Sequence, residues 1–340
     1  MPRFHRRAFI AFLVSIFLAV VLAPGWARAS CGSASCPAET AAWDERKAGE
    51  VTLSYDFEYA DQDEHRIGTR GASFGEIRGH HDEEFTVNRT HRAAISVTFT
   101  DRLSADLSAP LVSRSHAHVH HHHGEDILES WDFEGLGDLR LLTRFLFWKP
   151  ENPRNPALSV LLGGEFPTGD SDEANEGGDI AELGIQPGSN SYDLLLGLSS
   201  RQVFKAPMAK GGYGTLPFFV SLLGQLNGAG TDDYRLGDTL QVSAGTSYPL
   251  LPKVGLMGQV NFLLKDRDDK GRTSEEIQKT GGEFLYLSPG LEFRPTDNWR
   301  VYMLAQIPVY QRVNSIQVVS DYNLLFGAAW RFDTRRARTR

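Results

Sequence analysis

The residues best suited to chemistry form a histidine-rich tract at positions 116–126. This tract holds six imidazoles and two carboxylates within eleven residues. Neutral imidazole suits Zn, Cu or Ni, and a His-rich tract is a compositional signal of metal binding. The candidate ligands here are His116, His118, His120, His121, His122 and His123. We predict a His-rich extracellular loop at this point in the chain.

A preceding polar stretch adds His80 and His81, followed by three carboxylates. Because both stretches connect neighbouring predicted strands, we expect them to meet at one mouth of the fold. The tract has no fixed tetrahedral spacing, so the sequence leaves the geometry and the identity of the metal open. No cofactor is required, and Cu, Zn and Ni are the candidate ions. The alternative is that these histidines only keep an exposed rim polar.

The cysteines are Cys31 and Cys36, with four residues between them. In an oxidising compartment such a pair most simply closes one small disulfide loop. Two other interpretations stay open. The pair could bind Cu(I) or exchange redox equivalents as thiolates, or Cys31 could carry a lipid.

The N-terminus is typical of an export signal. Three arginines precede an apolar run at 8–23, and Ala27-Arg28-Ala29 offers a small-x-small cleavage site. The run is shorter than the roughly 20 residues that a membrane-spanning helix needs.

Removing residues 1–29 deletes four arginines and no carboxylate, so the formal net charge moves from -8 to -12. An acidic mature chain argues against nucleic acid as a partner, and the lack of another long apolar run excludes a helical membrane protein.

From about residue 51 onward, apolar and polar residues alternate with a period of two. In 321–332, for example, Tyr322, Leu324 and Phe326 share one face with Trp330, and Asn323 lies on the other. This pattern predicts β-strands with one apolar face. The expected strands are 51–61, 85–100, 103–114, 135–149, 156–168, 191–206, 213–228, 237–250, 253–267, 281–294, 298–312 and 320–332. An even number of this kind fits an all-β, transmembrane, antiparallel up-and-down β-barrel of about 12 strands.

The connectors support a barrel because short and long ones alternate. Short links at 100–102, 250–252 and 295–297 carry Pro and Asp. Longer polar stretches lie near 62–84, 115–134, 169–190, 229–236, 268–280 and 313–319. We expect the short set to face the periplasm and the long set to face outside, in the outer membrane of a Gram-negative cell. The resulting organisation is a signal peptide at 1–29, a periplasmic segment with the Cys pair at 30–50, a barrel at 51–332 and a basic tail at 333–340.

A soluble sandwich or lipocalin-like barrel would also alternate. The long strands weigh against it, as do aromatic residues near strand ends, where girdle residues of a membrane barrel lie. These aromatic residues are Trp148, Tyr248, Trp299, Tyr310 and Phe332.

If the aliphatic faces point to lipid, the opposite faces line the lumen. The lumen candidates are Asp138, Arg140, Arg144, Glu165, Arg201 and Gln306. Twelve strands enclose a lumen that is wider than that of eight-strand barrels, which side chains fill, and narrower than that of sixteen-strand porins. This size favours a narrow conduit, and the alternative is that charges of both signs pair and seal the barrel.

Several segments resemble a known family. Residues 163–170 (GGEFPTGD), 285–295 (LYLSPGLEFRP) and 305–310 (AQIPVY) are similar to strands of a proteobacterial outer-membrane barrel family of transporters and porin-like proteins, among them the meta-pathway phenol-degradation group. The resemblance covers about half the chain and implies a location and a fold more than a cargo. The strand ending at Phe332 is similar to the signal read by the barrel-assembly machinery, although this chain continues beyond it.

Catalysis is not expected. His80, Asp82 and Glu84 could form a general-base cluster, but no Ser nucleophile with a Gly-rich turn accompanies them. Our first hypothesis is a narrow conduit for a small solute, either a hydrophobic or aromatic compound or a metal-linked cargo. The alternative is a surface metal-binding or assembly protein anchored by a plugged barrel. Either protein would contact outer-membrane lipid and the barrel-assembly machinery.

Overall fold

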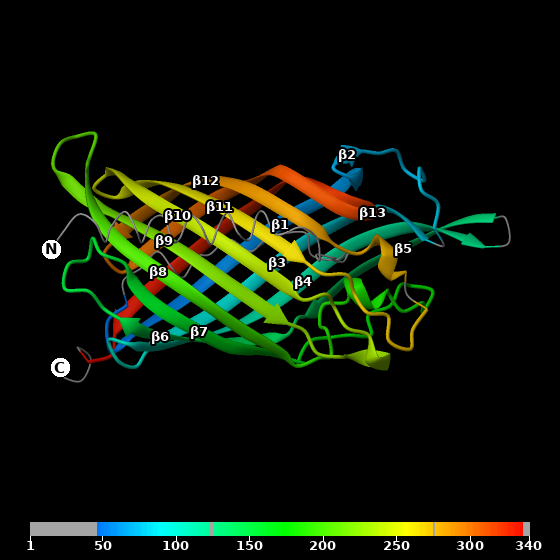
Figure 1. Cartoon of the computed structure of the whole chain (residues 1–340), viewed down its shortest axis with the longest axis horizontal. Coiled ribbons are helices and arrows are strands. Elements are labelled where there is room, and N and C mark those ends of the chain that lie inside the picture. The colour runs from blue at the N-terminus through cyan, green and yellow to red at the C-terminus, as the bar shows by residue number, and fades with distance from the viewer. Residues whose placement is uncertain (1–45, 80, 123–124, 275, 336–340) are drawn as a thin grey trace, which may run out of the picture.

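The chain forms one closed antiparallel β-barrel with strongly tilted strands (Figure 1). The structure is a computed structural model that describes residues 46–79, 81–122, 125–274 and 276–335. The expected signal peptide, the Cys31 and Cys36 pair, His80, His123 and the last five residues lie outside this described part. Neighbouring strands follow each other around the wall in chain order, and β13 pairs with β1 to close the ring.

The strands are β1 (Glu50–Gly68), β2 (Arg70–Gly71), β3 (His81–Thr98), β4 (Leu103–His122), β5 (Glu125–Leu136), β6 (Leu139–Trp148), β7 (Ala157–Phe166), β8 (Asp193–Pro207), β9 (Tyr213–Leu226), β10 (Thr239–Leu251), β11 (Val254–Lys265), β12 (Gly282–Thr296) and β13 (Trp299–Asp333). Three 3-10 turns are also present, η1 (Leu183–Ile185), η2 (Thr231–Asp233) and η3 (Ile277–Lys279). In the described residues, no helix is both long and apolar enough to cross a membrane.

The last strand, β13, contributes two passes of the wall. Its first part pairs with β12 up to Val313, and its second part pairs with β1 from Ile316 onward. Between them Ser315 adopts a positive φ of 52°, a conformation found in tight turns. Ten other strands, β1, β3, β4 and β6 to β12, complete the ring, so the wall has the twelve passes that the sequence predicts.

The expected long connector at 313–319 is wrong, because the two passes of β13 are joined by a tight turn. Val313, Val318 and Val319 are almost fully buried there. This apolar content suits a continued strand, and only Asn314 and Ser315 are left for the reversal.

The wall is apolar outside and polar inside, which is the reverse of a soluble protein. On β11, Asn261 and Gln259 are 0% and 1% exposed, whereas Leu256 and Val260 are 43% and 41% exposed. A strand with this alternation can be stable only if its outer face meets lipid and its inner face meets polar partners. Asn261 has such partners, because its side-chain amide donates to Ser243 Oγ at 2.9 Å.

Aromatic side chains gather at the end of the barrel that carries the short turns. Trp299 and Trp330 stack with their ring centroids 6.0 Å apart, and the Phe332 ring lies 4.9 Å from Trp330. Trp148 at the end of β6 is 57% exposed. Both ends of the described chain lie on this side, because Glu50 pairs with Asp333. We call it the inner end and the opposite one the outer end.

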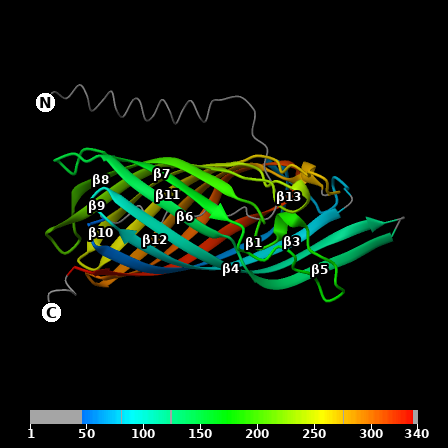
Figure 2. The same cartoon turned by 90° about the horizontal axis from the view of Figure 1, so that it is seen from below.

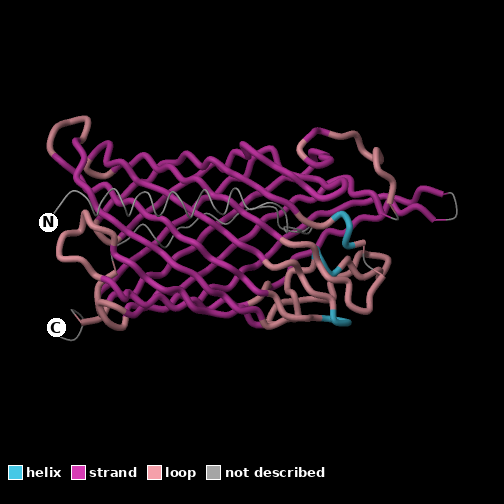
Figure 3. The backbone as a smooth tube through the Cα atoms, in the orientation of Figure 1, coloured by secondary structure: helices cyan, strands magenta, loops and turns pink. Residues whose placement is uncertain are grey.

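The outer end carries the long connections and all three 3-10 turns (Figure 3). One element projects beyond the others, the hairpin of β4 and β5 (Figure 2). The lower part of β4 pairs with β6 up to Ser108, and from Leu111 to His122 β4 pairs with β5 instead. The hairpin from residue 112 upward therefore stands outside the lipid-facing wall.

This hairpin corrects the predicted extracellular loop at 115–134. Residues 116–122 of the histidine-rich tract belong to a strand that pairs with β3 on one side, up to His120, and with β5 on the other. Its polar composition suggested a loop because the strand signal in this chain comes from lipid-facing residues. A strand above the membrane rim has no lipid to face and can be polar on both sides.

Candidate functional site

A cavity of about 290 Å³ occupies the outer half of the barrel interior. Side chains from β1, β3, β4, β6, β7, β9, β10 and β11 line it, so it is enclosed by strands from opposite sides of the ring. Its charged lining residues are Glu58, Arg92, Arg114, Asp138, Arg140, Glu165 and Lys265. The cavity thus presents both charge signs to any solute within it.

The connection from β7 to β8, residues 167–192, folds over this cavity and is called the strap below. Its residues 183–184 and 186–189 form part of the cavity lining. Asp138 fastens the strap at both ends, because its carboxylate accepts hydrogen bonds from the amides of Thr168, Gly169 and Ser189 at 3.0, 2.9 and 2.7 Å. The Ser189 hydroxyl donates to the same carboxylate at 2.7 Å.

Two cavities lie at the inner end of the lumen, with volumes of about 300 and 160 Å³. Arg201 lines both of them, and Arg144 lines the smaller one. At the start of the described chain, Arg46 reaches into this end, where it donates to Ser104 at 2.9 Å and to both Asp106 oxygens at 3.0 Å. Basic residues predominate in these linings.

Between the outer and inner cavities the interior is narrowed by packed side chains. On β9, Gln225 lines the outer cavity and Pro217 lines the larger inner one, which places Phe219 between them. Phe219 is 1% exposed and packs in a cluster with Tyr302 and Leu304. A solute crossing the barrel would have to pass this aromatic layer.

All six lumen candidates lie inside the barrel. Asp138, Arg140 and Glu165 line the outer cavity, and Arg144 and Arg201 line the inner ones. Gln306 is 2% exposed, and its amide oxygen accepts a hydrogen bond from Asn323 at 3.3 Å. Their role in passage stays a prediction.

The histidine tract is divided by strand geometry. His116, His118 and His120 project to one side of β4, and His121 projects to the other. The His121 ring nitrogens lie 2.6 Å from Asp126 and 2.8 Å from an oxygen of Asp82. The tract therefore cannot gather all its imidazoles around one ion, and His122 ends the strand.

A β-bulge brings His81 to the side of the ladder that carries His118. Glu83 pairs with His118 and the next paired residue, Phe85, pairs with Ala117, so Glu84 is the extra residue. Such a bulge reverses which side chains face a given side of the strand. As a result the rings of His81 and His118 stack, with centroids 4.4 Å apart and an interplanar angle of 15°.

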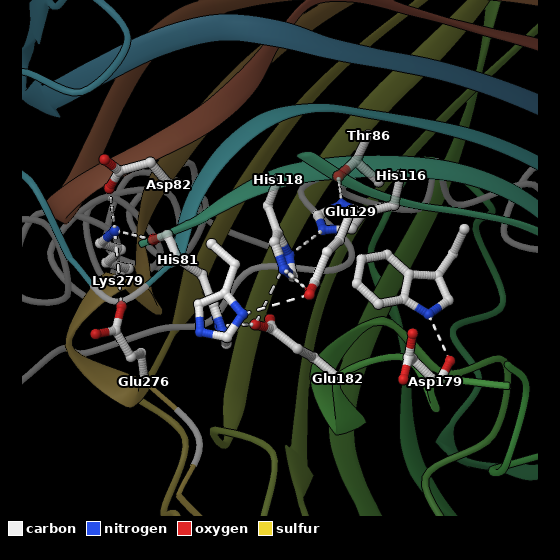
Figure 4. Close-up of polar contacts among 12 residues, drawn as sticks. His81, Asp82, Thr86, His116, His118, Glu129, Asp179, Glu182, Glu276 and Lys279 are labelled. Atoms are coloured by element: carbon white, nitrogen blue, oxygen red, sulfur yellow. Dashed lines mark hydrogen bonds and ion pairs between the residues drawn. The ribbon is translucent and has the colours of Figure 1, made fainter. Parts of the chain in front are cut away.

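Glu182 of the strap completes a three-residue cluster with these two histidines (Figure 4). Its Oε1 lies 2.7 Å from His81 Nδ1 and 4.0 Å from His118 Nδ1. The three potential ligand atoms all lie within 4.8 Å of one another. One carboxylate from the strap thus meets two imidazoles from the barrel wall.

Further side chains orient this cluster. Glu129 of β5 accepts from His118 Nε2, with a separation of 3.1 Å, and lies 3.3 Å from His120 Nδ1. Behind His118, His116 Nε2 is 3.3 Å from His118 Nδ1, and His116 Nδ1 is 2.8 Å from the hydroxyl of Thr86. Trp131 covers both rings and donates its indole N–H to a strap carbonyl, that of Asp179, at 2.9 Å.

The surroundings shift the protonation of the cluster. Burial lowers the pKa of His116 to about 4 and also lowers the pKa of His118. Burial opposes ionisation of Glu182, but the hydrogen bond to His81 and the nearby imidazoles outweigh it and lower the pKa of Glu182 to about 2. For His81, burial opposes protonation and the same hydrogen bond favours it, with a net rise in pKa. At neutral pH the cluster therefore combines an ionised carboxylate with unprotonated His116 and His118.

Sequence reasoning found His81, His116, His118 and His120 but missed Glu182, Glu129 and Trp131. Glu182 lies in a polar stretch that is indistinguishable from any long loop. Its partners are 64 or more positions earlier in the chain. No local pattern marks such a contact.

The fold and the lumen define the class of protein. A closed antiparallel barrel with an apolar outer face, a polar interior and long connections at one end has the architecture of an outer-membrane β-barrel protein. The family described as "Putative MetA-pathway of phenol degradation" matches residues 129–313, more than half of the 340-residue chain. The chain belongs to this family.

Solved structures share the fold at low sequence identity. An outer membrane channel from Pseudomonas putida F1 is 13% identical with a TM-score of 0.58, covering 87% of this chain and 100% of that one. The NanC porin is 7% identical with a TM-score of 0.43, covering 82% and 98%. A Pseudomonas aeruginosa FadL homologue is 10% identical with a TM-score of 0.42, covering 91% and 99%. The chain has no match among curated proteins.

Proposed function

We propose that the protein is a narrow outer-membrane channel for a small aromatic solute. The observation that carries the proposal is the arrangement of the lumen, with charged cavities at both ends and an aromatic layer between them. Arginine and carboxylate side chains can hold the polar group of such a solute, and Phe219 and Tyr302, which are buried in the packed middle layer, would offer ring faces to its apolar part only when that layer opens. The description of the family, which refers to phenol degradation, supports the same solute class.

Passage through this lumen requires no covalent chemistry. The inner wall supplies hydrogen-bonding groups that replace part of the water around a solute, and the apolar outer belt keeps the barrel in lipid. The narrow middle favours one solute molecule at a time over free diffusion of a solution.

The test is the current through the detergent-folded protein after insertion into planar bilayers, with benzoate as the probe. We expect a small conductance in potassium chloride and a dose-dependent reduction when benzoate occupies the lumen. Arg140→Ala should raise the benzoate concentration needed for half of that reduction by about tenfold, the size expected for the loss of one charge-assisted hydrogen bond. Arg312→Ala is the matched control, because Arg312 pairs with Glu283 at 2.7 Å and is 51% exposed.

Two results would contradict the proposal. One is a reduction by benzoate that is equal in the Arg140 and Arg312 variants. The other is the absence of conductance from protein that is folded and inserted. The second result would favour the alternative function, a plugged barrel that anchors a surface metal-binding or assembly protein.

A further inference from the structure

We propose that His81, His118 and Glu182 bind one divalent transition-metal ion, such as Zn(II), that fastens the strap to the rim of the barrel. This site differs from a flexible histidine tract. It uses two imidazoles from β3 and β4 and a carboxylate from a connection far along the chain. It also leaves out His121, which faces the opposite side of β4.

The donor set fits such an ion. Once His81 has lost its proton, two neutral imidazoles and one carboxylate leave an open coordination position, and this is the ligand composition of known Zn sites. With bond lengths of about 2.0 Å, tetrahedral ligands lie roughly 3.3 Å apart. The potential ligand atoms here lie between 2.7 Å, from Glu182 Oε1 to His81 Nδ1, and a limit of 4.8 Å. Changes of up to about 1.5 Å in the separations of these atoms would therefore close the site.

The surroundings of His118 orient it for coordination. Its Nε2–H points to Glu129 Oε2 at 3.1 Å, which leaves Nδ1 as the unprotonated nitrogen, 4.0 Å from Glu182 Oε1. An ion bound at Nδ1 would replace its present contact with His116 Nε2, at 3.3 Å. A carboxylate behind a metal-binding histidine fixes the tautomer in this manner and strengthens the ligand. His118 is 1% exposed, so the arrangement excludes most competing water.

Binding at this site would act on the lumen through the chain. Glu182 directly precedes η1, and residues 183–184 with 186–189 line the outer cavity. Without an ion, the contact of Glu182 with the wall is a hydrogen-bonded pair with His81. With an ion, coordination bonds would join the strap to two neighbouring strands. Metal binding itself does not depend on the proposed channel function, whereas an effect of metal on current does.

The test is calorimetric titration of the full detergent-folded chain with Zn(II), and with Cu(II) and Ni(II) in parallel. We expect one site with micromolar affinity for Zn(II). Glu182→Gln keeps the size of the side chain and a hydrogen-bond acceptor for His81 but removes the charge, and it should weaken binding by about tenfold or more. His118→Ala should have a similar effect.

His121→Ala is the matched control, because it removes a neighbouring imidazole of the same tract that lies outside the cluster. It should change the affinity by less than about twofold, since side chains on opposite sides of a strand do not share an ion. Equal losses in the His118 and His121 variants would show a diffuse histidine tract and overturn the proposed site. Unchanged affinity in Glu182→Gln would overturn it as well.

A second measurement covers variants that fold poorly. Hydrogen exchange of the strap is followed with and without Zn(II) in the original protein. Slower exchange within 167–192 on adding Zn(II), with no change in the β8–β9 turn at the inner end, is the expected result. If Zn(II) binds but leaves strap exchange unchanged, the ion does not hold the strap. That outcome would not affect the channel proposal, which rests on the benzoate experiment.

Discussion

Acidification should loosen the β4–β5 hairpin through His116. This imidazole is 0% exposed, and burial lowers its pKa from 6.5 to about 4. An opened hairpin would take up a proton below pH 6.5, whereas the closed one resists protonation until about pH 4. The stability that His116 supports is therefore complete above pH 6.5 and is lost as the pH falls toward 4. At pH 5 the lost stability is about 2 kcal/mol, or roughly a 30-fold rise in opening.

Hydrogen exchange of residues 112–122 at pH 7.5 and pH 5.0 measures this effect, with a chelator present and with correction for intrinsic exchange rates. His116→Gln provides the comparison because Gln does not titrate and the other titrating groups are kept. For each protein, the free energy of hairpin opening at pH 5.0 is compared with its value at pH 7.5. A pH-independent effect of the substitution on this free energy therefore cancels. The original protein should lose about 2 kcal/mol more than the variant. Equal losses in both proteins would refute the reasoning.

Three further predictions concern the strap, the wall and the inner mouth. Asp138→Ala removes the acceptor of four strap hydrogen bonds, so cleavage of the strap by added protease should accelerate by at least about tenfold. Unchanged cleavage would mean that other contacts hold the strap. Gly327→Val places a side chain against the ring of Tyr302, and overpacking of about 1–3 kcal/mol should lower the unfolding temperature measured by gel mobility; an equal or higher temperature would contradict this packing. Arg46→Ala removes a side chain that pairs with Asp106 in the inner mouth, so single-channel current should rise, whereas an equal or smaller current would show that this pair does not obstruct the path.

The barrel could be predicted from sequence because contact with lipid requires an apolar side chain at every second position of each strand. Alternation on β11, where Leu256 and Val260 face outward and Asn261 faces inward, is visible without any knowledge of strand pairing. Parts of a strand that extend beyond the membrane do not show this alternation. For this reason the sequence predicts a loop from residue 115, although β4 continues there and pairs with β5 up to His122 and with β3 up to His120.

The histidine cluster could be predicted only in part. Composition drew attention to His81 and His118, but their contact depends on the bulge at Glu84, which no residue type in this stretch announces. Glu182 joins them only after the strap folds across the mouth. Contacts between distant segments depend on closure of the ring, and single-sequence patterns do not record it.

The two halves of β4 have consequences for how this chain can change over time. Below Ser108 the strand must keep apolar residues such as Leu103 and Leu107 outward, and these are 39% and 41% exposed. Above residue 112 the outward side chains have no lipid to face, so there the restriction is lifted, whereas inward residues such as Arg114, His116 and His118 keep buried contacts. Divergence among relatives should therefore concentrate at the outward positions of this half, such as Ser113 and Ser115. The same half offers a place where whole residue pairs can be inserted to lengthen the hairpin while the wall below stays unaltered.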